Sequence, residues 1–368
     1  MVSTNLRAAA PTAIDLFCGV GGLSLGLSQT GFKLTGAADS DQGVLDMHAV
    51  NFPDVPVACL DLFSATAKSI RQVLKLGKTQ IDLLAGGPPC QGFSSGGVQH
   101  PRDNRNKGVP AFARLVTELR PRYFLMENVR GLMFAKHKPK RKQFERTLRD
   151  SGYIVMPFKL LDASDFGVPQ RRVRSFVMGC LEGQRVPNYP VAEIGPKVTV
   201  ADAIRDLSEI DRHLVIHEED AFTGVLASPS EYASRMRQAG GTVKILTGCL
   251  KSVHTETVVK RFKDTPPGGQ EPISRFYRLK WDGVSPTIRA GTGPERGSHT
   301  APRPIHPEWP RCITVREAAR LHSFPDWFQF RGTRWHGFRQ IGNSVPPLLA
   351  KAVGQAIYEA CVKGGSNL

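Results

Sequence analysis

The chain has 368 residues, of which 40% are hydrophobic and 22% are charged. This composition excludes a small disulfide-stapled scaffold and a mainly disordered chain. Because no apolar run reaches about 18 residues, we expect no membrane span. Lys and Arg number 49 against 33 Asp and Glu, for a net charge of +16, which points to a polyanionic partner, with nucleic acid as the first candidate.

The seven cysteines are widely spread, with no pair at the short spacing of a zinc site or a redox loop. We therefore expect a reducing compartment and no metal centre. The first residues, MVSTNLRAAAPTAIDLF, lack the apolar core of a signal peptide, so we expect a cytoplasmic protein.

From residue 12 to about residue 180, short apolar runs alternate with longer helical patterns, as in strands joined by crossover helices. The runs are apolar throughout, which is typical of strands covered on both faces. The predicted fold class is therefore α/β with an open, mostly parallel sheet. The predicted strands are TAIDLF, KLTGAAD, VPVACLD, IDLLAGG, YFLMEN and VRSFVMGC, and the predicted helices lie near residues 23–29, 44–51, 65–76 and 112–119.

Between about residues 181 and 310 the sequence is rich in Gly, Pro, Ser and charge, without a clear period, which predicts a second, irregular region. Further on, Thr314 and Glu317 have the spacing of a capping box and predict a helix over TVREAARLHSF. A last helix is predicted over residues 346–362, after Ser344 and with two prolines in its first turn.

The first predicted strand runs into DLFCGVGG, where Gly19, Gly21 and Gly22 form a turn with little side-chain bulk. Such a turn lets a ligand approach backbone N–H groups at a helix N-terminus. Asp39 ends the next strand, where a carboxylate can accept hydrogen bonds from ribose hydroxyls. The pair indicates a nucleoside-bearing cofactor, although the glycines could serve only a tight turn. The spacing is not G-x-G-x-x-G, which disfavours a nicotinamide enzyme.

Three further motifs follow predicted strands. Cys90 lies in GGPPCQGFS after the fourth strand, as a nucleophile or as a structural thiol in a Pro/Gly turn. Glu127 in MENV ends the next strand, where a desolvated carboxyl group can act as an acid or hydrogen-bond donor, or only cap a helix. Arg172 and Arg174 are spaced by two, so we expect both on one face, suited to a phosphate or a base carbonyl.

The motifs DLFCGVGG, GGPPCQGFS, ENV, QRRVR, TVREAARLHSFPDWF and RQIGNSVPP, in this order, resemble the DNA (cytosine-5) methyltransferase family of prokaryotic restriction–modification systems. The resemblance implies a Rossmann-like, S-adenosylmethionine-dependent catalytic domain formed by residues 1–182 and 336–368. Residues 183–335 would form a smaller, irregular target-recognition domain and hinge. The implied reaction transfers a methyl group from S-adenosyl-L-methionine to C5 of cytosine in a specific duplex DNA sequence, through base flipping and a covalent bond to C6.

The resemblance also assigns roles to single residues. Cys90 would attack C6, Glu127 would contact N3 and the exocyclic amine, and Arg174 with Arg172 would hold the base carbonyl and a nearby phosphate. The cofactor residues would be Phe17, Gly19, Gly22, Asp39, Asp61, Pro89, Asn343 and Val345. Asp39 departs from the family's usual Glu by one methylene. The DNA-binding residues would be Gln91, Ser94, Arg105, Thr287 and Arg289.

Further cations are candidates for DNA contact. The basic segment from Lys136 to Arg146 is either a backbone contact or a solvated helix face. Candidate base readers in the variable region are Arg235, Arg237, Lys251, Arg261, Arg275 and Arg278.

We expect double-stranded DNA as the partner of a monomer in the prokaryotic cytoplasm, with a cognate restriction endonuclease acting separately and no membrane contact. Two alternatives share the fold: a tRNA cytosine-C5 methyltransferase and a catalytically inactive DNA-binding relative. A dinucleotide oxidoreductase is a remote third.

Overall fold

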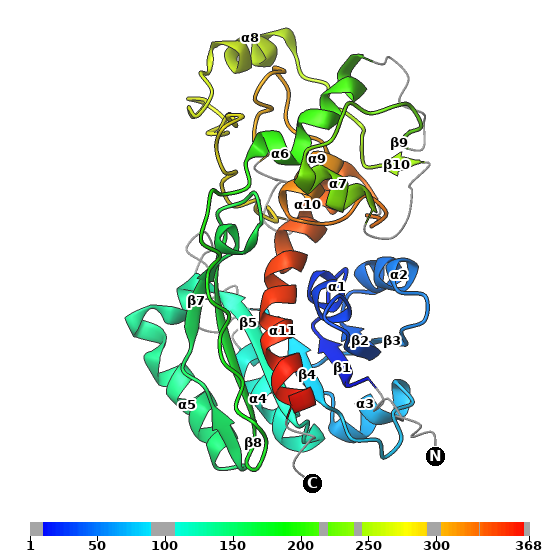
Figure 1. Cartoon of the computed structure of the whole chain (residues 1–368), viewed down its shortest axis with the longest axis vertical. Coiled ribbons are helices and arrows are strands. Elements are labelled where there is room, and N and C mark those ends of the chain that lie inside the picture. Colours follow the sequence, from blue (N-terminus) through cyan, green and yellow to red (C-terminus); the bar gives the residue numbers. More distant parts are fainter. Residues whose placement is uncertain are drawn as a thin grey trace, which may run out of the picture.

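The computed structural model describes residues 10–89, 107–212, 220–238, 245–292, 303–330 and 332–363. Its centre is an eight-stranded sheet in the order β3-β2-β1-β4-β5-β8-β6, with β7 also paired to β8 (Figure 1). The strands are β1 (Thr12–Leu16), β2 (Lys33–Asp39), β3 (Val57–Cys59), β4 (Leu83–Gly86), β5 (Tyr123–Val129), β6 (Tyr153–Val155), β7 (Lys159–Asp162) and β8 (Val173–Leu181).

The strands from β1 to β5 pair in parallel, whereas β8 runs antiparallel to β5, β6 and β7. The mostly parallel α/β fold predicted from the apolar runs is therefore confirmed. β6 and β7 are short strands that the sequence pattern did not reveal.

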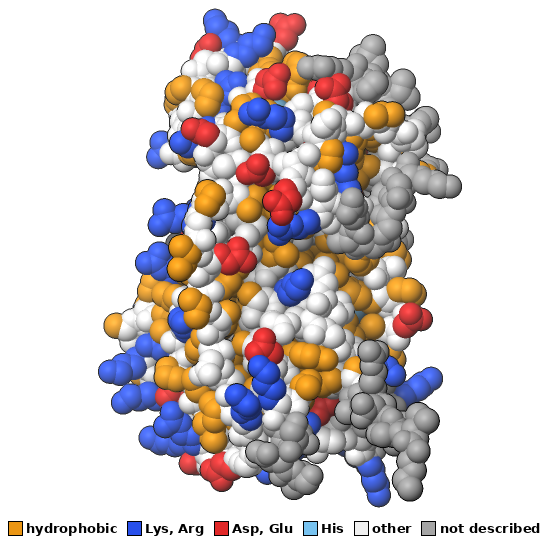
Figure 2. Space-filling view, in the orientation of Figure 1, with side chains coloured by type: hydrophobic (Ala, Val, Ile, Leu, Met, Phe, Trp, Pro, Cys, Tyr) orange, Lys and Arg blue, Asp and Glu red, His pale blue; other side chains and the backbone are white. Residues whose placement is uncertain are grey.

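Helices cover both faces of the sheet. Consecutive side chains of a strand point to opposite faces, and in β1 Ala13 joins one hydrophobic cluster while Ile14 and Leu16 join another. This two-sided burial explains why the strands are apolar throughout. The helices are α1 (Gly22–Ser28), α2 (Gln42–Asn51), α3 (Ala67–Val73), α4 (Gly108–Leu119), α5 (Lys138–Arg149) and α11 (Pro347–Lys363). Figure 2 shows basic side chains along the lower left flank, where Figure 1 draws α5.

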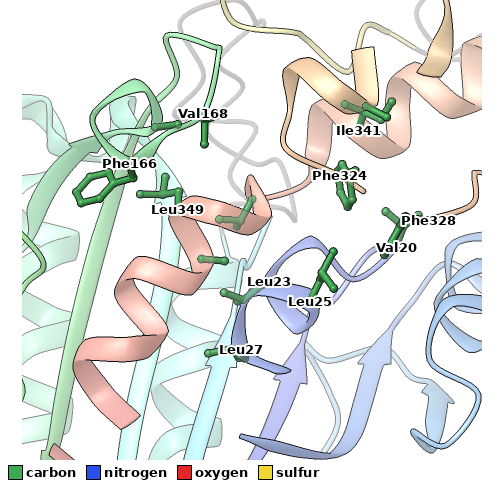
Figure 3. Close-up of a cluster of buried hydrophobic side chains, with 14 of the residues drawn as sticks. Val20, Leu23, Leu25, Leu27, Phe166, Val168, Phe324, Phe328, Ile341 and Leu349 are labelled. Carbon is green, nitrogen blue, oxygen red and sulfur yellow. The ribbon is translucent and has the colours of Figure 1, made fainter. Parts of the chain in front are cut away.

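The last helix, α11, packs against α1, so the two ends of the described chain meet in one core. Leu23, Leu25 and Leu27 of α1 and Leu349 of α11 are buried together there, next to Phe324 (Figure 3). The segment leading into α11 is thereby held beside the turn that follows β1.

The part of the chain between β8 and α11 has little regular structure and lies mainly at the upper end of the molecule in Figure 1. Its elements are α6 (Val200–Ile204), β9 (Ala221–Phe222), α7 (Glu231–Gln238), β10 (Leu246–Thr247), α8 (Glu256–Asp264), α9 (Val315–Leu321) and α10 (Arg334–Asn343). The predicted capping box is present, because Thr314 N–H donates to Glu317 Oε2 at 2.7 Å and Glu317 N–H donates to Thr314 Oγ1 at 3.2 Å. Within the described ranges, none of the helices has the length and apolar character needed to cross a bilayer.

Buried arginines hold this irregular part together. Arg320 is fully buried and its guanidinium lies within 3.3 Å of Asp206 and 2.5 Å of Asp326. Arg311 donates to Asp211 at 2.8 Å and to Glu317 at 2.8 Å. Charged groups that are buried in this way are stable only when they are paired and hydrogen-bonded. These pairs add to an apolar core in the same region, which includes Ile204, Phe222 and Leu279.

Candidate active site

Glu127 and Arg174 form an ion pair at the end of β5. Glu127 lies on β5 and Arg174 on β8. These two strands run antiparallel, with Glu127 opposite Phe176 and Val129 opposite Arg174. Arg174 Nε lies 3.1 Å from Glu127 Oε1, and each side chain is less than 15% exposed. Burial raises the pKa of the Glu127 carboxyl group, and the positive charges of Arg174 and Arg172 partly oppose that rise. The pair thus places a carboxyl group with a raised pKa next to a cation, with both side chains largely buried.

The backbone that follows β4 lies against this pair. Asn128 Nδ2 donates to the carbonyl oxygen of Pro88 at 3.1 Å, and a Cβ atom placed on Gly87 would lie 3.2 Å from Glu127 Oε2. Pro89 is half-buried and is the last described residue before the gap. The predicted nucleophile and loop residues, Cys90, Gln91, Ser94 and Arg105, lie outside the described residues.

Arg172 is placed differently from what its spacing predicts. β8 begins at Val173, so Arg172 lies before the strand and does not share a strand face with Arg174. Its side chain is buried, and the guanidinium donates to three carbonyl oxygens: Ile288 at 3.0 Å, Gly342 at 2.7 Å and Ser344 at 2.9 Å. These hydrogen bonds commit Arg172 to the protein backbone. No described group bonds to its buried Nε, and the expectation that Arg172 binds the base carbonyl or a phosphate stays a prediction.

Arg172 and the carbonyl groups it binds form a buried junction. Gln170 and His322, which the sequence analysis did not single out, also belong to it. Gln170 accepts a hydrogen bond from Ile288 N–H at 3.0 Å, and its amide nitrogen lies 2.9 Å from His322 Nδ1. His322 Nε2 lies 3.1 Å from the carbonyl oxygen of Ser344. Burial lowers the pKa of His322 well below its usual value, so the imidazole is neutral, with Nε2–H as the donor. The QRRVR, RLHSF and GNSV motifs meet at this junction.

The turn after β1 brings together most of the predicted cofactor residues. Phe17 and Gly19 have positive φ angles of 58° and 53°, and Gly21, with φ 99°, caps α1. Asp39 Oδ2 accepts a 3.0 Å hydrogen bond from Gly19 N–H. A Cβ atom on Gly22 would overlap the carbonyl oxygen of Val345, which places the C-terminal motif against this turn.

The other predicted cofactor residues lie at exposed positions. Asp61 follows β3, and its carboxylate accepts hydrogen bonds from Phe63 N–H at 3.0 Å and Ser64 Oγ at 2.9 Å. The Phe63 ring lies 6.1 Å from the Phe17 ring, so the Asp61 turn borders the β1 turn. Asn343 is exposed at the end of α10.

These residues fit a cofactor that carries a nucleoside and positive charge. A Cβ atom on Gly19 would meet no described atom within 4 Å, which leaves space beside the backbone. Asp15 at the end of β1 is fully buried, and no described group bonds to its Oδ1. Its other oxygen accepts a hydrogen bond from Ser24 Oγ at 2.7 Å, and Ser24 Oγ lies 3.0 Å from His48 Nε2. Asp15 is a buried acid that the sequence analysis missed, although it begins the DLFCGVGG motif.

Thr287 and Arg289 are the two candidate DNA contacts near residue 288. The first forms a hydrogen bond within the protein, and the second has an exposed side chain. Thr287 Oγ1 donates to the carbonyl oxygen of Arg171 at 2.7 Å, while the side chain of Arg289 is exposed. The side chain of Arg171 is 82% exposed and borders a pocket of about 550 Å³ shared with Tyr277 and Ser285. Arg171, which the sequence analysis passed over, therefore faces solvent, and its Nε lies 3.7 Å from Asp162 Oδ2.

The structure separates the candidate base readers into two groups. Three of them are bound within the fold. Arg278 donates to the carbonyl oxygens of Phe262 and Thr265 at 3.0 Å and 2.9 Å. Arg237 donates to Asp206 at 3.0 Å, and Arg261 lies 3.0 Å from the buried Glu271. These contacts disfavour the three among the candidate base readers. Lys251 Nζ also lies 3.6 Å from Asp211 Oδ1, and 29% of its side chain is exposed. Arg235 and Arg275 have exposed side chains and remain candidates.

Asp211, His306 and Glu317 cluster closely enough to suggest a metal site. However, Arg311 donates to both carboxylates. His306 Nδ1 accepts the N–H groups of Glu308 and Trp309 at 3.1 Å and 3.0 Å, so its proton lies on Nε2 and faces Glu317. The guanidinium thus supplies the positive charge of this cluster.

Comparisons with known proteins agree with this geometry. The chain is 44% identical over 365 residues to the type II methyltransferase M.XorII of Xanthomonas oryzae pv. oryzae, covering 96% of this chain and 86% of the relative. It is 30% identical to the type II methyltransferase M.AgeI of Thalassovita gelatinovora, covering 94% and 99%.

Among solved structures, a candidate DNA modification methyltransferase encoded within a prophage (E. coli) superposes with a TM-score of 0.81 at 34% identity, covering 95% of this chain and 99% of that one. The Entamoeba histolytica methyltransferase EhMeth shares the fold, with a TM-score of 0.62 at 16% identity, covering 96% and 99%. A model of the C-5 cytosine-specific DNA methylase family matches residues 12–359, and the chain belongs to this family of DNA (cytosine-5) methyltransferases.

Proposed function

We propose that this enzyme methylates C5 of a cytosine in a specific duplex DNA sequence, using S-adenosyl-L-methionine and a transient bond between Cys90 Sγ and C6 of a flipped base. The observation that carries the proposal is the Glu127–Arg174 ion pair, which lies against the backbone leading into Cys90. The pair places a carboxyl group with a raised pKa and a positive charge next to the backbone that precedes Cys90.

The proposed chemistry follows from the weak nucleophilicity of cytosine C5. Cys90 loses its thiol proton and bonds to C6, so the ring loses its aromaticity and electron density moves to N3 and C5. Glu127 shares a proton with N3 as that charge develops, and Arg174 orients the carboxyl group and faces the base carbonyl. C5 then takes the methyl group, and a base or a water molecule removes the C5 proton. The electrons of that C–H bond re-form the C5–C6 double bond as the sulfur leaves C6 as a thiolate.

S-adenosylmethionine supplies an electrophilic methyl group on a sulfonium centre. The residues proposed to hold it are Phe17, Gly19, Gly22, Asp39, Asp61, Pro89, Asn343 and Val345. Support comes from the contact of Gly19 with Asp39, the contact of Gly22 with Val345 and the open space at Gly19. Asp15 adds a buried acid at the same turn, with an Oδ1 that has no described partner and a pKa that burial raises to about 7.

The DNA side of the proposal uses residues other than the ion pair. Cytosine C6 is inaccessible inside a duplex, so the base must be extruded, at a cost of a few kcal/mol. We assign Gln91, Ser94, Arg105, Thr287 and Arg289 to DNA contact, and residues 183–335 to target recognition and the hinge. We also propose a monomeric enzyme that acts in the prokaryotic cytoplasm, with a cognate endonuclease acting separately. The names of the type II relatives support the restriction–modification setting.

The test is methyl transfer from labelled S-adenosylmethionine to plasmid DNA and, in parallel, to tRNA. We expect labelled plasmid, unlabelled tRNA, methylcytosine at one sequence by bisulfite sequencing, and loss of transfer in Cys90→Ser. A 5-fluorocytosine duplex should form a covalent adduct with the wild type and none with the variant. Transfer to tRNA alone, or undiminished transfer by Cys90→Ser, would refute the proposal.

A further inference from the structure

Helix α5 presents a stripe of positive charge that the proposed reaction does not use. Lys138, Lys142, Arg146 and Arg149 are all exposed, and none of them forms an ion pair with a described carboxylate. At about 100° per residue, the four positions lie within about 80° of the helix circumference, and at about 1.5 Å per residue they span about 16 Å. The stripe is therefore a continuous basic surface.

The helix is firmly held, so this surface has a fixed orientation. Phe144 and Leu148 are buried in the core on the opposite side of α5, which packs against α4 and β6. Arg141 donates to the carbonyl oxygens of Leu132 and Phe134, which ties the first half of the helix to the preceding turn. The one carboxylate within α5 is Glu145, so the helix keeps a strong excess of positive charge.

The basic surface begins close to the candidate active site. β5, which carries Glu127, ends at Val129, and the exposed Arg130 starts the short 3-10 helix Arg130–Met133 at this carboxyl edge of the sheet. A second short turn, Ala135–His137, leads directly into α5. Figure 2 shows the basic side chains continuing down this flank. DNA that reaches Glu127 would therefore pass near the start of the stripe.

We infer that the stripe Lys138, Lys142, Arg146 and Arg149 binds the sugar–phosphate backbone of duplex DNA beside the target site. The inference rests on the proposed function, which brings DNA to the carboxyl edge of the sheet. A row of long, exposed cations matches the phosphates of one strand and reads no sequence, so its contribution is electrostatic and comes from counterion release. The stripe extends the bound length of DNA beyond the recognition sequence.

The test compares two variants of equal charge. The first carries Lys138→Glu, Lys142→Glu and Arg146→Glu. The matched control carries Lys33→Glu, Lys75→Glu and Lys78→Glu, three exposed positions near the starts of β2 and β4, at the opposite edge of the sheet. Both variants lower the net charge from +16 to +10, so a difference between them reports the place of the charge.

The readouts are binding to a mixed-sequence duplex of about four turns, roughly 40 base pairs, at several salt concentrations, and methyl transfer at saturating plasmid. For the α5 variant we expect the slope of log affinity against log salt to fall by about 2 to 3, with roughly tenfold or more weaker binding near 0.1 M salt. The control should keep the wild-type slope, and both variants should keep the wild-type rate at saturating DNA.

An unchanged slope in the α5 variant, or an equal loss in both variants, would overturn the inference. A folding defect is recognised separately, because it would lower the melting temperature and the rate at saturating DNA. Failure of the proposed function is also distinct, since the wild type would then transfer no methyl group to plasmid DNA.

Discussion

Arg172 donates a 2.9 Å hydrogen bond from Nη2 to the carbonyl oxygen of Ser344, 172 residues further along the chain. This contact joins the segment that leads into Arg174 to the segment that enters α11 and touches Gly22. The catalytic candidate and the cofactor candidate thus share one buried anchor.

Replacing Arg172 with Met should lower the free energy of unfolding by about 3 kcal/mol or more, because the carbonyl oxygens of Ile288 and Gly342 lose their buried donor. Urea unfolding measures the change. The matched control is Arg171→Met, whose side chain is 82% exposed and should change stability by less than about 0.5 kcal/mol. Equal stability losses in the two variants would contradict the anchor role.

Replacing Glu127 with Gln should reduce the methyl-transfer rate by roughly a hundredfold or more, because the variant cannot share a proton with the base or pair with Arg174. Binding of S-adenosylmethionine should change little, which calorimetry can measure. The control is Glu118→Gln, since Glu118 pairs with Arg114 on the surface of α4. A Glu127→Gln enzyme with a normal rate would exclude Glu127 from the chemistry.

Burial raises the pKa of Asp15 from 3.8 to about 7, against the opposing hydrogen bond from Ser24. The folded state therefore holds a proton that the unfolded state releases between about pH 4 and pH 7. The stability from this group is present below pH 4 and is lost as the pH rises toward 7.

The variant Asp15→Asn removes this titration, so the stability of the wild type relative to the variant should fall across that range. Chemical unfolding at several pH values, without cofactor, measures the difference. Burial also lowers the pKa of His48 to about 4, and its effect runs in the opposite direction, but it is common to both proteins. A difference that stays constant or rises from pH 4 to pH 7 would contradict the burial of Asp15.

Replacing Arg311 with Met should lower the free energy of unfolding by about 3 to 5 kcal/mol, because it leaves the carboxylates of Asp211 and Glu317 buried without their guanidinium partner. Urea unfolding of the wild type and of the Arg311→Met variant measures this loss. The control Arg235→Met breaks an exposed pair with Glu231 and should change stability by no more than about 1 kcal/mol. If added zinc restored the Arg311→Met variant fully, the cluster would have to be treated as a metal site.

Local patterns were sufficient for strands β1 to β5 and β8, for helices α1 to α4 and for α11, but not for the short strands β6 and β7. The continuous apolar runs predict strands buried on both faces, and residues 12–16 and 123–129 are such strands. The pairing of Glu127 with Arg174 was expected only in part: each residue was a candidate, but their 3.1 Å contact depends on β8 running antiparallel to β5.

Side-chain direction outside the strands was decided by the tertiary structure. Two arginines at a spacing of two share a face only within a strand, and β8 begins one residue too late for Arg172, so Arg171 faces solvent in its place. In the irregular region, hydrophobic periodicity carries little information, because buried arginines such as Arg311 pair with acids as distant as Asp211, 100 residues away. A sequence pattern can predict that an arginine contacts DNA, but folding can bury the same side chain among carboxylates or carbonyl oxygens. The arginine then has a structural role, because a buried charge requires such partners.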